Sequence, residues 1–177
     1  MKDKVFSSQF IILCLIILCA SLSRLLSNQL HLWNFTPIAA MALFSGASFR
    51  EKKYAFLVPL IAMVVTDFII GFHPGIWDVY GAFAIITVIG IYLRNRVSVP
   101  NIILASLVSS LLFFFITNFF VWLGAGLYTQ DAQGLGKCFA EGIPFFGNTI
   151  AGDLFYCGVL FGGYELLKKT NPSIIKV

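Results

Sequence analysis

Six long apolar runs dominate this sequence and restrict what it can fold into. A helix needs about 20 mostly apolar residues to cross roughly 30 Å of hydrocarbon, and in lipid its backbone polar groups must be paired within the segment. Of the 177 residues, 59% are hydrophobic and only 11% are charged, which is too apolar for an ordinary soluble domain. The runs predict one all-α integral membrane domain over residues 1–177, a bundle of six transmembrane helices with approximate spans 10–26, 36–49, 54–72, 78–93, 101–123 and 144–167.

The basic residues indicate how these helices are oriented, because Lys and Arg near helix ends prefer the cytoplasm. With six spans and an inside N-terminus, ten of the twelve Lys and Arg residues are cytoplasmic, and only Arg24 and Lys137 face outward. This distribution predicts cytoplasmic N- and C-termini, with the lipid bilayer as a partner. It also accounts for the net charge of +4 without a nucleic-acid partner.

Two alternatives concern the first two runs. The second run has only 14 residues, so a re-entrant half-helix competes with a full span. A full span is preferred because a re-entrant segment moves Arg50, Lys52 and Lys53 to the wrong side. The first run also has the layout of a secretory signal, with a charged start, an apolar stretch and small residues near position 20.

Polar side chains within the spans gather at one depth. At 1.5 Å of rise per residue, they fall in the outer part of the bundle, whereas the inner half is almost purely apolar. We expect these side chains to line an outward-opening pocket that binds a small molecule. The candidate ligand-binding residues are Asn34, Thr36, Asp67, His73, Trp77, Tyr80, Asn118, Trp122, Asn148 and Asp153.

Asp67 and Asp153 are the best-supported members of this set. A carboxylate within a span costs about 2.5 to 3.5 kcal/mol on insertion scales, so both should face the bundle interior or a cavity. Structurally, they would hydrogen-bond Asn118, Asn148 and neighbouring Thr hydroxyls and hold helices together. Functionally, they would line the pocket.

The remaining candidates lie in the outer loops. Tryptophans near a membrane interface are usually anchors, but here they are also compatible with walls that stack on a flat ligand, with Tyr80 and Tyr128 at its polar edge. The stretch 124–142 is the only long loop and is a candidate lid. Cys138 is predicted to be exposed there without an outer partner, as a free thiol, a metal ligand or neither.

Several motifs carry a resemblance that covers nearly the whole chain from Arg24 onward. The sequence resembles a family of small bacterial membrane proteins without assigned function, and more distantly the substrate-binding S-components of energy-coupling-factor vitamin transporters, especially the solitary cobalamin-transporter branch. The motifs are residues 34–44, Asp67 with Gly71-Phe72-His73, Thr117-Asn118-Phe119, and Ile143-Pro144-Phe145-Phe146 with Asn148 and Gly152-Asp153.

The resemblance implies an S-component-like bundle in the bacterial inner membrane that binds a vitamin-like molecule in a cavity open to the outside. Cobalamin is one ligand that it suggests. In that branch an outer cysteine ligates the cobalt, whereas here the turn after the third run carries His73, whose imidazole is a candidate axial ligand. The first run also lacks the Ala-rich spacing with which many S-components dock their coupling subunit.

The sequence therefore favours a substrate-binding transport component, working with an energy-coupling subunit or as a homo-oligomer. One alternative is a membrane enzyme that uses Asp67, Asp153 and His73 as acid and base. The other is a structural or assembly protein in which the polar residues only hold helices together.

Overall fold

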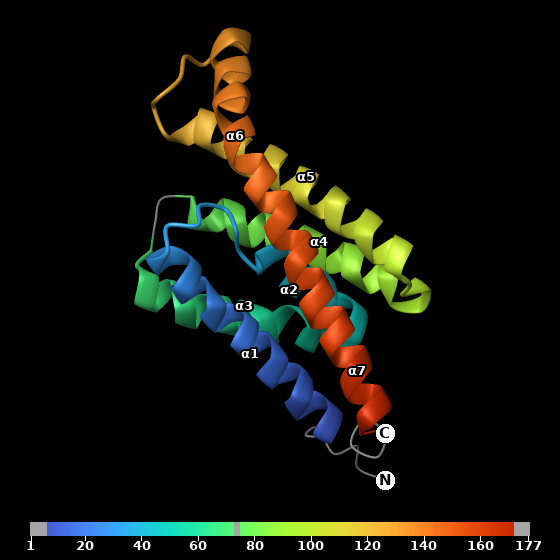
Figure 1. The fold of residues 1–177 in the computed structure, drawn as a ribbon. Helices are drawn as coiled ribbons and strands as arrows, with labels where there is room; N and C mark the ends of the chain where they lie inside the picture. Colours follow the sequence, from blue (N-terminus) through green and yellow to red (C-terminus); the bar gives the residue numbers. More distant parts are fainter. Residues whose placement is uncertain (1–6, 73–74, 172–177) are drawn as a thin grey trace.

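The computed structural model describes residues 7–72 and 75–171, and within these ranges all regular structure is helical (Figure 1). The elements are α1 (Ser8–Gln29), α2 (Ile38–Ser48), α3 (Lys52–Ile70), α4 (Ile76–Leu93), the 3₁₀ turn η1 (Arg94–Arg96), α5 (Val99–Gly124), α6 (Ala132–Cys157), the π-helical segment η2 (Gly158–Gly162) and α7 (Gly163–Thr170). Helices α6, η2 and α7 follow one another without a break and form a run of 39 residues.

Five of the helices are long and apolar enough to cross a membrane, with this last run counted as one helix. Helix α2 is the exception, because its 11 residues rise only about 16 Å, roughly half of the hydrocarbon thickness. The helix is thus shorter than the predicted span 36–49. It begins only after Pro37, and the preceding segment holds His31 and Asn34 at positive φ, which a helix does not allow.

Helix α2 lies at the centre of the bundle. All ten residues from Ile38 to Ala47 are buried, as expected for a helix that is apolar on every side. A Cβ atom at Gly46 would overlap the Thr87 carbonyl of α4, and one at Gly90 would overlap the Leu43 carbonyl of α2. These two glycines let the backbones of α2 and α4 approach closely.

The C-terminal end of α2 is capped by a basic side chain. Arg94 donates from Nη2 to the Gly46 carbonyl at 2.9 Å and from Nη1 to the Arg50 carbonyl at 2.8 Å. A cation at this end of a helix is favourable because the unpaired carbonyls carry partial negative charge.

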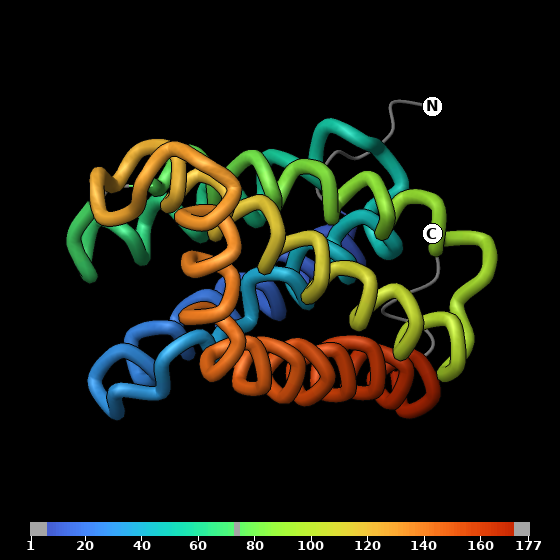
Figure 2. The backbone as a smooth tube through the Cα atoms, turned by 90° about the horizontal axis from the view of Figure 1, so that it is seen from above, coloured from blue at the N-terminus to red at the C-terminus, as the bar shows by residue number. Residues whose placement is uncertain are grey.

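The predicted loop 124–142 is largely helical, which corrects the sequence-based expectation of a long lid. Asp131 caps α6 by accepting from the Gly134 amide at 2.7 Å, so the helix starts at Ala132 and the connection shrinks to residues 125–131. Pro144, predicted to open the sixth span, lies inside α6. Figure 2 shows that α6 bends along its course, which fits the hydrogen bond that Pro144 cannot donate.

The helices of the bundle pack against one another in pairs. Helix α1 packs on α3, α2 on α4, and α5 on α6. The first turn of α1 and helix α7 meet at one end of the bundle (Figure 1), where Gln9 donates to the Tyr164 hydroxyl at 2.9 Å. The start of α2 and the segment before it lie nearer the opposite end, where the polar residues gather.

Candidate functional site

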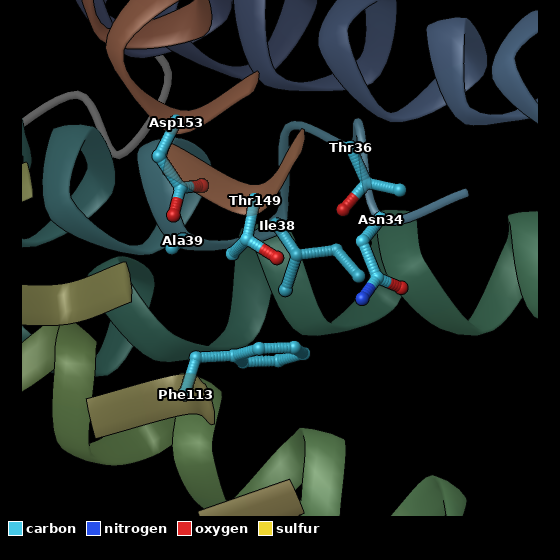
Figure 3. Close-up of a pocket in the computed structure, with 7 residues that line it drawn as sticks. All are labelled: Asn34, Thr36, Ile38, Ala39, Phe113, Thr149 and Asp153. Carbon is cyan, nitrogen blue, oxygen red and sulfur yellow. The ribbon is translucent and has the colours of Figure 1, made fainter. Parts of the chain in front are cut away.

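The predicted polar layer separates into two groups on opposite sides of the segment that precedes α2. We call the first the Arg24 cluster, formed by Arg24, Thr66, Asp67 and Tyr80. We call the second the Asp153 cavity, lined by Asn34, Thr36, Ile38, Ala39, Phe113, Thr149 and Asp153 (Figure 3).

The Arg24 cluster is a buried ion pair in which both oxygens of the Asp67 carboxylate accept a hydrogen bond. Arg24 Nη2 lies 2.6 Å from Asp67 Oδ1, and Arg24 Nη1 donates to Thr66 Oγ1 at 2.7 Å. The Tyr80 hydroxyl donates to the other Asp67 oxygen at 2.7 Å. Only 8% of Arg24 and 2% of Asp67 is exposed. The cluster therefore links α1, α3 and α4 and leaves no free carboxylate oxygen at Asp67.

Arg24 belongs to the candidate site but was missed by the sequence interpretation, which counted it only as an outward-facing charge. A signal was present, since an arginine inside the apolar run 10–26 needs a buried partner. Ser21, one turn away on the same helix, also faces α3 and donates to the Ala62 carbonyl at 3.2 Å. The polar face of α1 thus packs against α3.

Asp153 has a different environment. Only 3% of it is exposed, and Ser110 of α5 lies 2.6 Å from its Oδ2 atom. Among the described residues, it forms no ion pair. Figure 3 shows its carboxyl group beside Thr149 and Ala39, with the Phe113 ring on the opposite wall.

The other wall of the Asp153 cavity is the non-helical segment that leads into α2. Gly152 allows this segment to approach α6, because a Cβ there would lie 3.1 Å from the Thr36 nitrogen. Asn148 holds the segment from α6 by donating to the Trp33 carbonyl at 3.1 Å. The first turn of α2 has no side-chain cap, and its residues Ile38 and Ala39 face the cavity.

A second cavity lies against the Arg24 cluster and shares Thr36 with the first. Its lining residues are Arg24, Ser27, Asn28, Leu32, Trp33, Thr36 and Ile70. With the space at their open mouths included, the volumes are about 230 Å³ for the Asp153 cavity and about 550 Å³ for the second. Much of this space is open to the outside, and the enclosed part of the Asp153 cavity has room for only about one water molecule, so it fits only a small guest.

Those remaining predicted residues that the structure describes do not line either cavity. Trp77 is 79% exposed and packs edge-on against Tyr80, which is typical of an interfacial tryptophan. Asn118 donates within α5 to Phe114, and Trp122 donates to the Thr129 carbonyl at 2.8 Å. His73 lies outside the described residues.

Hydrogen bonds from its own side chains hold the connection between α5 and α6 against α6. Tyr128 donates to Glu141 at 2.7 Å, and this bond raises the pKa of Tyr128 to about 12. The Gly134 amide, which bonds to Asp131, lowers the pKa of that carboxyl group.

The predicted exposure of Cys138 is wrong, because α6 buries the thiol and directs it to the Asn118 carbonyl at 3.3 Å. Within the described ranges no group of three His, Cys, Asp or Glu side chains is placed to hold a metal ion.

Over the residues that the structure describes, the protein is all-helical, and the length and composition of its helices fit a multi-pass membrane protein with a buried ion pair and a small polar cavity beside a short central helix. The chain belongs to the family of unknown function DUF6580, whose sequence profile matches residues 4–174. Neither a curated protein nor a solved structure matches this sequence.

Proposed function

We propose that this protein is a substrate-binding transport component of the bacterial inner membrane, with six passages of the chain and cytoplasmic termini. The positive charges at one end of the bundle support this orientation. In it, the second passage consists of residues 30–37 and α2. Non-helical backbone is tolerated at membrane depth where it is buried in protein or lines a cavity, and this segment does both.

The single observation that carries the proposal is Asp153, a buried carboxyl group that lines a cavity and has no basic partner among the described residues. A structural carboxyl group is normally matched by a cation, as Asp67 is by Arg24. Binding sites in membrane transporters commonly lie at interrupted helices, where unpaired backbone groups face a ligand. The start of α2 beside Asp153 has this arrangement.

Cavity size restricts the ligand class. The enclosed part of the Asp153 cavity has room for roughly one water molecule, so it admits a small ion or one polar group of a larger molecule, whereas a corrin ring requires the helices to separate. The proposed ligand is therefore smaller than cobalamin, and the likeness to vitamin-transporter S-components supports only the general arrangement of a binding subunit. A coupling subunit or a second copy of this chain would then drive release of the ligand.

The alternative of a membrane enzyme receives less support from this geometry. It requires Asp67 as a free acid or base, but both of its carboxylate oxygens are engaged by Arg24 and Tyr80. The structural alternative describes the Arg24 cluster well, since that cluster joins three helices. It does not explain why Asp153 lines a cavity.

The proposal is tested by thermal unfolding of the purified protein in mild detergent with small amines, amino acids, vitamins and cobalamins. A solute at 100 times its dissociation constant stabilises the folded state by about 2.7 kcal/mol. We expect at least one small solute to raise the melting temperature of the wild type and of Ser109→Ala, whose hydroxyl is buried outside the cavity. Asp153→Asn should lose the shift. No shift with any solute, or an equal shift in Asp153→Asn, contradicts the proposal.

A further inference from the structure

Among the described residues, Asp67 and Asp153 are the buried carboxyl groups, and their surroundings differ in charge. Asp67 meets a guanidinium at 2.6 Å and a phenol hydroxyl at 2.7 Å, which is the environment of an ionised carboxylate. Asp153 meets one serine hydroxyl and no cation among the described residues. A carboxylate charge buried with so little compensation is strongly disfavoured, so Asp153 is expected to carry a proton.

The geometry at Ser110 supports the protonated form. Ser110 Oγ lies 2.6 Å from Asp153 Oδ2 and 3.0 Å from the Ser106 carbonyl oxygen, but a hydroxyl group has only one proton to donate. If Asp153 is ionised, its Oδ2 atom and the Ser106 carbonyl oxygen are both acceptors, and the single Ser110 proton can bond to only one of them. If Asp153 is protonated, it donates to Ser110, and Ser110 donates to Ser106. The neutral acid thus completes both hydrogen bonds.

The elements packed around Asp153 contribute no basic group within the described ranges. Helix α5 presents serine hydroxyls and a phenyl ring, the start of α2 presents aliphatic side chains, and α6 itself adds a hydroxyl and a thiol. The facing residues are Ser106, Ser110, Phe113, Ile38, Ala39, Thr149 and Cys157, of which only the Cys157 thiol is titratable.

We propose that Asp153 is a proton-binding site that exchanges its proton for a monovalent cation entering the Asp153 cavity. This inference deepens the proposed function by naming the charge class of the ligand and a coupling ion. The exchange is balanced: the carboxyl O–H bond breaks, the proton leaves to water through the cavity, and one positive charge takes its place. No net charge is left unpaired in the membrane.

The cavity has the components to receive such a cation. Thr149 beside the carboxyl group, and Thr36 and Asn34 further along the cavity, offer uncharged oxygens to a cation, and Phe113 presents an aromatic ring. The enclosed space has room for roughly one water molecule, which fits Na⁺ or a terminal ammonium group.

A hydrophobic carbodiimide tests the protonation state directly and needs no knowledge of the natural ligand. It adds across the O–H bond of a protonated carboxyl group, and the product rearranges to a stable acylurea that mass spectrometry locates. We expect labelling of Asp153 but not of ion-paired Asp67, with Asp153→Asn as the control for assignment. Above the midpoint of the titration, labelling should fall by about tenfold for each pH unit, as for a single acid.

Cation exchange is tested by adding NaCl or methylammonium chloride, with N-methylglucamine chloride at equal ionic strength as the bulky control. We expect one or both small cations to protect Asp153, and the comparison tells an alkali ion from an ammonium group. Absence of Asp153 labelling at every pH overturns the proton site, and labelling unaffected by either small cation overturns the exchange. If Asp153 is labelled and protected but no transported solute is found, the proposed transport function fails while this site stands.

Discussion

The buried pair between Arg24 and Asp67 yields the sharpest prediction about stability. We expect Asp67→Asn alone to destabilise the fold strongly, because it leaves the Arg24 guanidinium buried without its counter-charge. Removing one partner of a buried ion pair typically costs about 3–5 kcal/mol. Arg24→Met alone should cost a similar amount, since it strands the Asp67 carboxylate.

The double variant Arg24→Met with Asp67→Leu should recover most of this loss. Two unit charges about 4 Å apart attract by about 4 kcal/mol at an effective dielectric constant of about 20. Desolvation of each ion costs several kcal/mol, so replacement of the whole pair by apolar side chains is often neutral or stabilising. The Tyr80 hydroxyl, which loses its acceptor Asp67, and the Thr66 oxygen, which loses its donor Arg24, limit the recovery.

The measurement is a double-mutant cycle on the free energy of unfolding in mixed detergent micelles. The exposed pair between Lys53 and Glu51, whose side chains are 60% and 57% accessible, is the matched control and should show less than about 1 kcal/mol of coupling. For Arg24 and Asp67 the double variant should be more stable than either single variant. If instead the two losses add to within about 0.5 kcal/mol, the ion pair contributes no coupling and the reasoning is refuted.

Three further predictions follow from the packing. Gly46→Leu should lower stability by about 3 kcal/mol, measured by the same unfolding assay, because its side chain meets the backbone of α4; an unchanged stability would contradict this crossing. Cys138 should resist a water-soluble maleimide, whereas Lys137→Cys, introduced with Cys138→Ser, should react quickly; rapid labelling of the wild-type thiol would show that it is exposed. The raised pKa of Tyr128 means that its bond to Glu141 is intact below pH 10 and is lost as the pH rises towards 12, so Glu141→Gln should shift the tyrosinate absorbance titration to lower pH.

Much of the fold was predictable from local composition. The first, third, fourth and fifth runs each correspond to one long helix, because an apolar run of that length in lipid has few other ways to pair its backbone. The prediction was wrong at residues 124–142, where Asp131 and its hydrogen bond to Gly134 start a helix. The glycines in this stretch had indicated a loop. The second run was the least certain, and the structure shows why: Pro37 and the positive φ angles before it delay the helix until Ile38.

The sequence by itself determined that Asp67 and Asp153 must avoid lipid, since the cost of exposing a carboxylate there depends only on residue type and position in a run. Only the tertiary structure decided their partners. Arg24 reaches Asp67 across 43 positions of sequence, and Ser110 reaches Asp153 across the same separation. Hydropathy assigns a residue to the membrane interior, but which helix faces meet depends on packing against all the others. The contrast between a compensated and an uncompensated carboxyl group therefore emerges only when the bundle is assembled.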